Sequence, residues 1–409
     1  MKESNKIPAG TKYIKMDGTV LKEGDKFPKI PNTGDTYTDN DYNYVYNKEV
    51  GMYWDDDTAE LYDFRKNESL NGWSVRVRDS KKTAYGDILT EIAGKPIVST
   101  TYAFADCKSL ITAPKIPDGV TKMNHTFQDC CSLKTAPKIP DGVKYLTDTF
   151  GGCSSLQTIP ELPNSIKGMN KAFEGCVSLK VAPKIPQNAI YMNGTFKGCT
   201  SLKIAPKIPN SVKTMEQTFS HCSSLITAPK IPKSVIDMEN TFKGCTSLEI
   251  APKITEGVKI MRGTFANCTS LTKAPKIPSS VETMERTFEY CSSLKTAPKI
   301  ANGVTDMYFT FFDCKSLTDV PKIPNSVTHM KGTFKNCASL ETAPKIPNGV
   351  TDISYTFQNC RSLKTASKIP DSVTDMYLTF KDCTSLKIAP KIPDGVTNIE
   401  DAFEGCICC

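Results

Sequence analysis

The stretch Thr195-Phe196-Lys197-Gly198-Cys199-Thr200-Ser201-Leu202-Lys203-Ile204-Ala205-Pro206-Lys207-Ile208-Pro209 recurs, with substitutions, every 23 residues through most of the chain. A fixed period between about 20 and 50 residues is typical of a solenoid, in which each unit covers the apolar face of its neighbour. The sequence therefore predicts about 13–14 stacked coils. Each coil is anchored by one phenylalanine of the series Phe104, Phe127, Phe150, Phe173, Phe196, Phe219, Phe242, Phe265, Phe288, Phe311, Phe334, Phe357, Phe380 and Phe403.

Apolar residues recur at fixed offsets from the anchor phenylalanine, which we number as position 0. They are mostly Val at −7, Met at −4, Cys at +3, Leu at +6, Ala at +9 and Ile at +12. The steps of 3, 4 and 3 from Val212 through Met215 and Phe219 to Cys222 predict one face of a short helix. Gly, Asn and Asp dominate position +2 and favour a left-handed backbone there.

The second half of each repeat reads Ser-Leu-x-x-Ala-Pro-Lys-Ile-Pro and predicts the extended side of the coil. Proline at +10 and +13 removes ladder donors and forbids a long regular strand. We therefore expect an α/β solenoid whose coil contains one short parallel strand, a bend and one short helix or helical turn.

Residues 1–85 have a different composition, which predicts a small β-rich domain ahead of the solenoid at 86–409. Tyr42–Tyr46 and Trp73–Arg78 alternate with period two, and Asp55–Asp57 reads as a hairpin turn before Leu61-Tyr62. Gly34-Asp35 and Asn71-Gly72 are further turn signals, and 84–99 reads as a degenerate first coil. A cap over the open end of the solenoid and an attachment module are both compatible with residues 1–85.

The phrase Phe-x-Gly-Cys-Thr-Ser-Leu-x-x-Ala-Pro-x-Ile-Pro-x-x-Val-x-x-Met resembles the BspA-type leucine-rich repeat of bacterial surface proteins over residues 98–409. The resemblance implies a right-handed leucine-rich-repeat solenoid with a parallel sheet on its concave face. It also implies binding or adhesion without catalysis. Two departures are the scarcity of leucine and the lack of a visible secretion signal or anchor.

The net charge and the hydropathy of the sequence indicate which partners are favoured and whether the chain spans a membrane. The net charge of +7 divides into −2 for residues 1–98 and +9 for the remainder, so the positive excess belongs to the repeats. Such a field favours anionic partners without naming one. No apolar run is long enough to span a membrane, and Met1–Pro8 lacks the apolar core of a signal peptide. Membrane insertion is therefore not expected.

The most regular exposed feature is lysine at position +11, interrupted by Glu161. On an extended side these ammonium groups would lie about 5 Å apart and repel one another by roughly 1 kcal/mol per neighbour in water. Either a polyanion spans the row, or the row is a solvated stripe that keeps the array soluble. The candidate ligand-binding residues are Lys115, Lys138, Lys184, Lys207, Lys230, Lys253, Lys276, Lys299, Lys322, Lys345, Lys368 and Lys391.

Fourteen of the seventeen cysteines occupy position +3, from Cys107 to Cys406, so the repeat explains their number. Reduced, buried thiols are the expected state. Disulfides between rungs would suit the required dihedral angle poorly, and a metal array would lack histidine partners. The tail Cys406-Ile407-Cys408-Cys409 either cross-links chains or marks the end of the repeat.

Catalysis is not expected, and neither is a cofactor. His125, His221 and His329 occupy three different repeat positions, and no phosphate loop, zinc-protease helix or nucleophile elbow is present. Asp55–Asp57 lacks the spacing of a calcium loop.

Two functions lead after catalysis is set aside, and a passive spacer is a third alternative. The first is a non-enzymatic binding or adhesion protein, outside the cell or on its surface, that recognises a host or cell-surface protein or an anionic glycan such as a teichoic acid. The second is a structural or receptor-binding component of a phage or prophage particle, attached through residues 1–85. Nucleic acid fits the charge of the lysine row but is not the expected partner.

Overall fold

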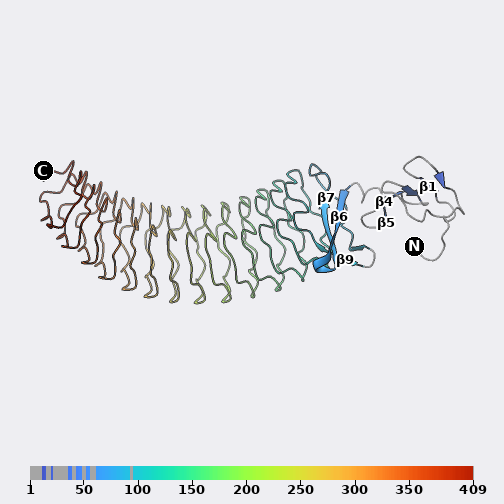
Figure 1. The fold of residues 1–409 in the computed structure, drawn as a ribbon, viewed down its shortest axis with the longest axis horizontal. Coiled ribbons are helices and arrows are strands. Elements are labelled where there is room, and N and C mark those ends of the chain that lie inside the picture. The colour runs from blue at the N-terminus through green and yellow to red at the C-terminus, as the bar shows by residue number, and fades with distance from the viewer. Residues whose placement is uncertain are drawn as a thin grey trace.

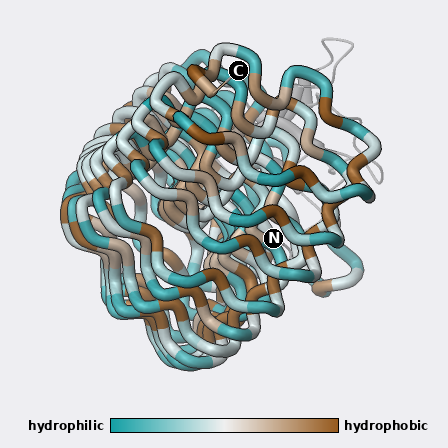
Figure 2. The backbone as a smooth tube through the Cα atoms, turned by 90° about the vertical axis from the view of Figure 1, so that its left-hand side faces the viewer, coloured by the Kyte–Doolittle hydropathy of each residue, from teal (hydrophilic) through white to brown (hydrophobic). Residues whose placement is uncertain are grey.

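The computed structural model describes residues 61–92 and 95–408, and, of the chain before them, the strand backbones at 12–14, 20–21, 36–38, 43–47 and 52–55. From residue 98 onward the chain winds into stacked rungs that follow a shallow arc to the C-terminus (Figure 1). Seen from the end, successive rungs lie one behind another, with apolar and polar segments recurring at matching places (Figure 2). The 23-residue spacing of the sequence therefore corresponds to one rung.

The core of the stack consists of columns of identical side chains. The anchor phenylalanines from Phe104 to Phe403 stack nearly parallel, with ring centroids 5.2–5.8 Å apart and planes within 3–13° of each other. The Cys, Leu, Val and Met columns beside them are buried through almost all of the array. The predicted core positions are confirmed.

Polar side chains in the core bond one rung to the previous one. The buried threonines at position −1 donate to the backbone carbonyl at −4 of the preceding rung at 2.8–3.0 Å, as Thr218 does to Met192. The thiols at +3 donate to the carbonyl of the preceding anchor phenylalanine at 3.0–3.2 Å, as Cys199 does to Phe173. Both side chains therefore satisfy carbonyls that the stack buries.

The segment predicted to be a short helix or a helical turn forms turns and no helix. In the described repeats, the stretch from Met to Cys forms consecutive turns with i to i−3 hydrogen bonds, such as Thr218 N–H to the Met215 carbonyl and Cys222 N–H to the Phe219 carbonyl. The backbone is left-handed at −2 and at +2 in every rung, as at Gln217 and His221. These left-handed residues interrupt any right-handed helix after a single turn. The expectation of left-handed geometry at +2 is confirmed.

The predicted extended side does pair in parallel, at position +8, but the more continuous pairing lies elsewhere in the repeat. Isolated parallel bridges link position −5 from rung to rung, for example Tyr145 to Gly168 and Gly168 to Tyr191. A second, discontinuous set links position +8, as in Ile204 to Thr227. Each coil therefore carries two bridge positions and no regular strand. The main ladder, at −5, lies in the −7 to −4 segment, which belongs to the stretch whose spacing predicts a helix.

Among the described residues, short strands and one 3₁₀-helix precede the regular rungs. One sheet has the order β2-β1-β3-β4-β5 and the other the order β6-β7-β9-β8. β7 and β9 pair in parallel, and the remaining strand pairs are antiparallel. The elements are β1 (Lys12–Ile14), β2 (Val20–Leu21), β3 (Thr36–Thr38), β4 (Asn43–Asn47), β5 (Met52–Asp55), β6 (Tyr62–Asn67), the 3₁₀-helix η1 (Glu68–Leu70), β7 (Gly72–Val77), β8 (Glu91–Ile92) and β9 (Lys95–Ser99).

The strands predicted within 42–46 and 73–78 are present as β4 and β7. Asn71 is left-handed between β6 and β7, as the Asn71-Gly72 turn signal indicated. The hairpin at Asp55–Asp57 is wrong, because β5 pairs with β4 while β6 pairs with β7 in the other sheet. Gly34-Asp35 lies outside the described residues.

The sheet of β6, β7, β8 and β9 adjoins the first rung (Figure 1). Ser99 occupies position −5 of the Phe104 rung and bridges to Lys122 of the following rung. The ladder therefore begins at the end of the segment 84–99. The Phe104 ring, which begins the column, meets the rings of Tyr62 and Tyr85 edge-on at 6.2 and 5.3 Å. These two tyrosines occupy the side of Phe104 on which a preceding rung would lie.

Candidate binding surfaces

All twelve lysines at position +11 are exposed, as is Glu161, which interrupts the row. The isoleucine or leucine at +12 is buried in nearly every rung, so the chain turns inward immediately after each lysine. Among the described residues none of the twelve forms an ion pair. Position +11 is not a bridge position, so the spacing of the lysines follows from the stack and not from a ladder of their own.

Two shallow hollows lie along this lysine row. One, of about 590 Å³, lies between Lys230 and Lys253 and is also lined by Lys233. The other, of about 400 Å³, lies between Lys368 and Lys391 and includes two aspartates. The first hollow is thus purely cationic in its charged groups, whereas the second is mixed.

A second surface follows the main ladder and was missed in the sequence. Because the methionine at −4 points into the core, its neighbours at −5 and −3 point outward, as alternation along an extended segment requires. Positions −5, −3 and −2 change identity from rung to rung, unlike the core columns. That variability among otherwise repeated residues is the sequence feature that could have revealed the surface.

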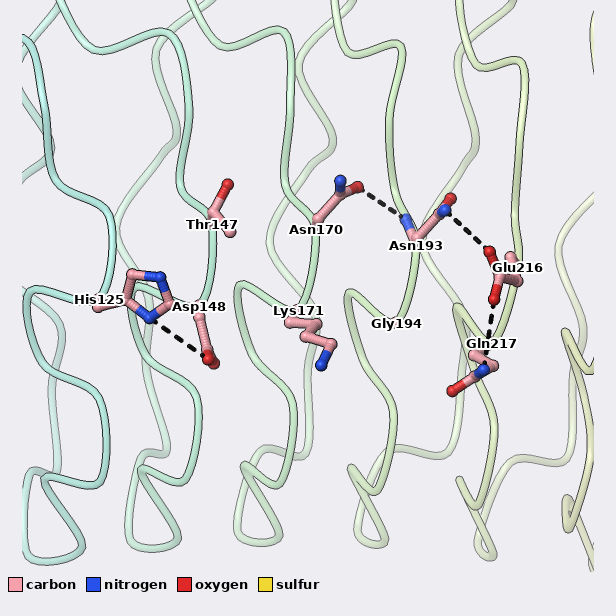
Figure 3. Close-up of a pocket in the computed structure, with 9 residues that line it drawn as sticks. All are labelled: His125, Thr147, Asp148, Asn170, Lys171, Asn193, Gly194, Glu216 and Gln217. Atoms are coloured by element: carbon pink, nitrogen blue, oxygen red, sulfur yellow. Dashed lines mark hydrogen bonds and ion pairs between the residues drawn. The ribbon is translucent and has the colours of Figure 1, made fainter.

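In the first half of the array this surface forms a hollow of about 470 Å³ (Figure 3). A chain of hydrogen bonds orients its amides. The Asn193 N–H donates to Asn170 Oδ1 at 3.1 Å, and the Asn193 side-chain amide donates to Glu216 Oε2 at 3.1 Å. The other Glu216 oxygen accepts from Gln217 Nε2 at 3.4 Å. The lining residues are His125, Thr147, Asp148, Asn170, Lys171, Asn193, Gly194, Glu216 and Gln217.

Most charged groups of this hollow are paired within the protein, while the Glu216 carboxylate accepts only from the amides of Asn193 and Gln217. His125 Nδ1 lies 3.5 Å from Asp148 Oδ2, and Lys171 Nζ lies 3.8 Å from Glu174 Oε2. Partial burial raises the pKa of the Asp148 carboxyl, and the neighbouring His125 partly offsets that rise. The hollow therefore presents hydrogen-bonding groups without a strong field of one sign.

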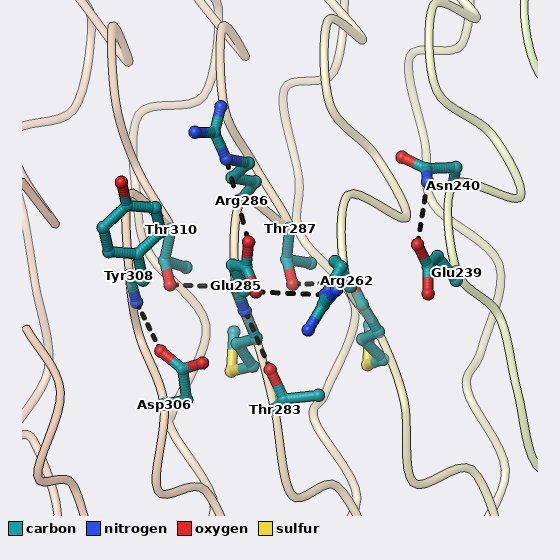
Figure 4. Close-up of polar contacts among 12 residues, drawn as sticks. Glu239, Asn240, Arg262, Thr283, Glu285, Arg286, Thr287, Asp306, Tyr308 and Thr310 are labelled. Atoms are coloured by element: carbon teal, nitrogen blue, oxygen red, sulfur yellow. Dashed lines mark hydrogen bonds and ion pairs between the residues drawn. The ribbon is translucent and has the colours of Figure 1, made fainter.

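Further along, the same surface holds a network of charges (Figure 4). Glu285 lies 3.0 Å from Arg262 Nε and 3.9 Å from Arg286 Nε, so one carboxylate bridges two guanidinium groups. The Tyr308 N–H donates to Asp306 Oδ1 at 2.8 Å. These contacts fix side chains at −5, −3 and −2 across three consecutive rungs.

Beyond this network, aromatic rings replace the small polar residues. Phe309 meets Tyr308 and Phe312 edge-on at 4.6 and 5.4 Å, and Lys335 lies over the rings of Phe312 and Tyr355. Burial lowers the pKa of the Lys335 ammonium group. These rings are only partly exposed because they pack on one another.

The remaining candidate groups do not converge. His125, His221 and His329 lie on different rungs and at different repeat positions. The cysteines at position +3 from Cys107 to Cys383 are all buried, as predicted, and no disulfide joins them. Burial raises the pKa of the thiols in the middle of the column, to about 12 for Cys222. No helix among the described residues is long and apolar enough to cross a membrane.

A search of curated proteins found none that matches the chain. A leucine-rich repeat protein from Bacteroides ovatus is similar in structure, with a TM-score of 0.54 and 23% identity, over 85% of this chain and 91% of that one. A leucine-rich cell surface protein from Faecalibacterium prausnitzii gives a TM-score of 0.50 and 22% identity, over 86% and 93%. Both likenesses support the solenoid fold. The model of the BspA type leucine rich repeat region matches residues 97–203, 170–295, 238–364 and 286–408. The chain therefore belongs to the BspA-type leucine-rich repeat family.

Proposed function

We propose that this chain is a non-enzymatic binding protein of a bacterial surface, which recognises an anionic polysaccharide along the lysine row. The observation that carries the proposal is the row itself: twelve exposed lysines at one position of the repeat, interrupted by Glu161, none of them ion-paired within the described residues. A host or cell-surface protein with an acidic face would meet the same chemistry.

Several cations of the solenoid outside the row do form ion pairs. Lys197 lies 2.9 Å from Glu174, Lys259 lies 3.0 Å from Glu282, and Lys364 lies 2.8 Å from Glu341. Pairing from rung to rung is therefore available on this scaffold, and the row does not use it. Unpaired charges in a line repel one another, and a polyanion lying along them removes that repulsion while steering its own approach.

The surface location rests on similarity. The Faecalibacterium prausnitzii protein is described as a cell surface protein, and the family implies binding in place of catalysis. For residues 1–85 we propose the capping role, because Tyr62 and Tyr85 cover the first phenylalanine of the column.

The test reverses the charge of four neighbouring lysines at once, with Lys207→Glu, Lys230→Glu, Lys253→Glu and Lys276→Glu. Heparin and dextran sulfate serve as probes, uncharged dextran as the negative control, and binding is measured at low and physiological salt. We expect the unmodified protein to bind both polyanions in a salt-sensitive manner, because exposed charges are screened within about 8–10 Å at physiological ionic strength. The four-residue variant should lose that binding.

A matched control carries the same change of charge in a different column. Lys144, Lys167, Lys213 and Lys259, all at position −6 and all exposed, are replaced with glutamate. This control should retain most of the binding if the row is the site. Equal loss in both variants would reduce the effect to net charge, and no polyanion binding at all would leave the row as a solvated stripe.

A further inference from the structure

We propose that the polar hollow of Figure 3, together with exposed Tyr145 and Tyr191 on its rungs and Tyr102 on the rung before them, is a binding site for a neutral oligosaccharide. The site lies on the ladder surface at positions −5, −3 and −2, apart from the lysine row at +11. It is independent of the proposed function, because the cation that lines it, Lys171, and His125 both lie beside carboxylates, and the Glu216 carboxylate, which has no ion pair among the described residues, does not favour a polyanion.

Tyr102, Tyr145 and Tyr191 supply the aromatic part of the site. These residues are 46%, 47% and 47% exposed. Rings that are so exposed contribute little to the stability of the solenoid. Tyr102 stacks on His125, which lines the hollow, with centroids 4.5 Å apart and planes 6° apart. Exposed rings of this kind pack against the C–H faces of sugar rings while their hydroxyl groups stay in water.

Gly168 makes room for one of these rings. It occupies position −5 between Tyr145 and Tyr191, and it pairs with both through the main ladder. A Cβ added at Gly168 would lie 2.8 Å from Cδ1 of the Tyr145 ring, so the ring edge occupies the space that any other residue would fill. The two tyrosines thus stand two rungs apart, on the order of 10 Å, with a side-chain-free rung between them.

The polar part of the site is already oriented before a ligand arrives. The Asn170–Asn193–Glu216 hydrogen bonds, extended by Gln217, hold four side chains in one arrangement. Within the described contacts, these bonds leave the Asn170 Nδ2 group and Gln217 Oε1 available as donor and acceptor. Sugar hydroxyls both donate and accept, so a row of amides and carboxylates is matched to them. Fixed side chains also reduce the entropy lost on binding.

The aromatic cluster around Phe309 does not compete for this role. Its rings pack on one another and on cations and are mostly half-buried, so their faces are already used. In the first half, by contrast, Tyr145 and Tyr191 have no ring partner among the described contacts, and they stand on the rungs of a hollow lined by polar and charged side chains and one glycine. A ligand with alternating C–H and hydroxyl surfaces therefore fits the hollow and its tyrosines, and it does not fit the Phe309 cluster.

The experiment uses the full chain and three neutral probes, namely cellotetraose, chitotetraose and mannotetraose. Binding is followed by saturation-transfer NMR and calorimetry at low and high salt. At least one tetrasaccharide should bind, with an affinity that salt leaves unchanged. The Tyr145→Ala/Tyr191→Ala variant should bind it roughly tenfold more weakly or worse, as expected for the loss of aromatic anchors.

The control is Tyr308→Ala/Tyr377→Ala, which removes two rings from position −3 of later rungs and should leave binding unchanged. Asn193→Ala tests the polar part of the site separately, because it breaks the hydrogen-bond chain without removing an aromatic ring. The proposal is overturned if none of the three probes binds, if the Tyr145/Tyr191 variant retains full affinity, or if the control loses as much. The four-lysine variant of the previous section should bind the neutral probe normally, so the two proposals fail separately.

Discussion

The phenylalanine at position 0 stacks on its counterparts in the neighbouring rungs. Each internal ring lies between two others at 5.2–5.8 Å and has no measurable exposure. Burial of an aromatic ring in such a position combines the hydrophobic term with a cavity that neighbours fixed by the backbone cannot close.

Phe219→Ala should therefore lower the free energy of unfolding by about 3–5 kcal/mol. Phe403→Ala is the matched control, because that ring is only partly buried at the last rung and its removal leaves a smaller cavity. Chemical denaturation of both variants measures the difference. Equal losses at the two positions would contradict a contribution from stacking on both sides.

For single residues, the sequence predicts the core positions, but it predicts only one of the two left-handed positions of the repeat. Position +2 is rich in Gly, Asn and Asp, and that composition indicated its backbone. Position −2 is just as left-handed, but it holds Phe309, Tyr355 and Leu378 among others, and such side chains conceal the conformation. The neighbouring rungs impose that geometry through hydrogen bonds such as Phe309 N–H to the Lys331 carbonyl, which no local preference records.

A single rung is held in shape by its turns. The 3-4-3 spacing of Val, Met, Phe and Cys is the same for a helix and for consecutive turns that return to one face, so periodicity could not separate them. Hydrogen bonds to the next rung decided the outcome, because Phe196 N–H bonds to the Thr218 carbonyl of the following rung. A helix would have kept that donor within its own rung.

Gly198→Val should destabilise the rung by about 1–2 kcal/mol, because φ is +73° there and a β-branched residue resists the left-handed region. Space is not the obstacle, since a Cβ would meet only Gly175 at 3.6 Å. Gly198→Asn should cost much less, because asparagine already occupies +2 at Asn267, Asn336 and Asn359. Thermal unfolding of the pair isolates the backbone contribution. Similar melting temperatures for the two variants would show that φ is not the cause.

Over the whole molecule, the stack behaves as a one-dimensional array in which each rung contacts its two neighbours. The sequence predicted this architecture because identical residues at one period can form columns only if the units stack. It did not predict the polar hollow, whose groups come from five rungs and meet only once the −3 and −2 columns are known to share a face. Its lining residues are those that do not repeat.

Removal of residues 219–241 deletes one complete repeat and joins Thr218 to Phe242 in register. We expect this shortened protein to unfold in one transition, with a melting temperature only slightly below that of the full chain, because every column continues across the junction. Removal of residues 219–240 displaces all later columns by one residue at the junction. Circular dichroism during heating should show a much larger loss for that variant, and equal melting temperatures would refute the column model.

The rung-to-rung hydrogen bonds have a mechanical consequence. A pull applied between the two ends of the stack loads the bonds of the outermost rung first, because no element crosses several rungs to share the force. Rungs would then detach one by one, each releasing 23 residues, or about 75–80 Å of extended chain, under a nearly constant force. A tether built in this way lengthens many times over and absorbs work before any covalent bond is strained.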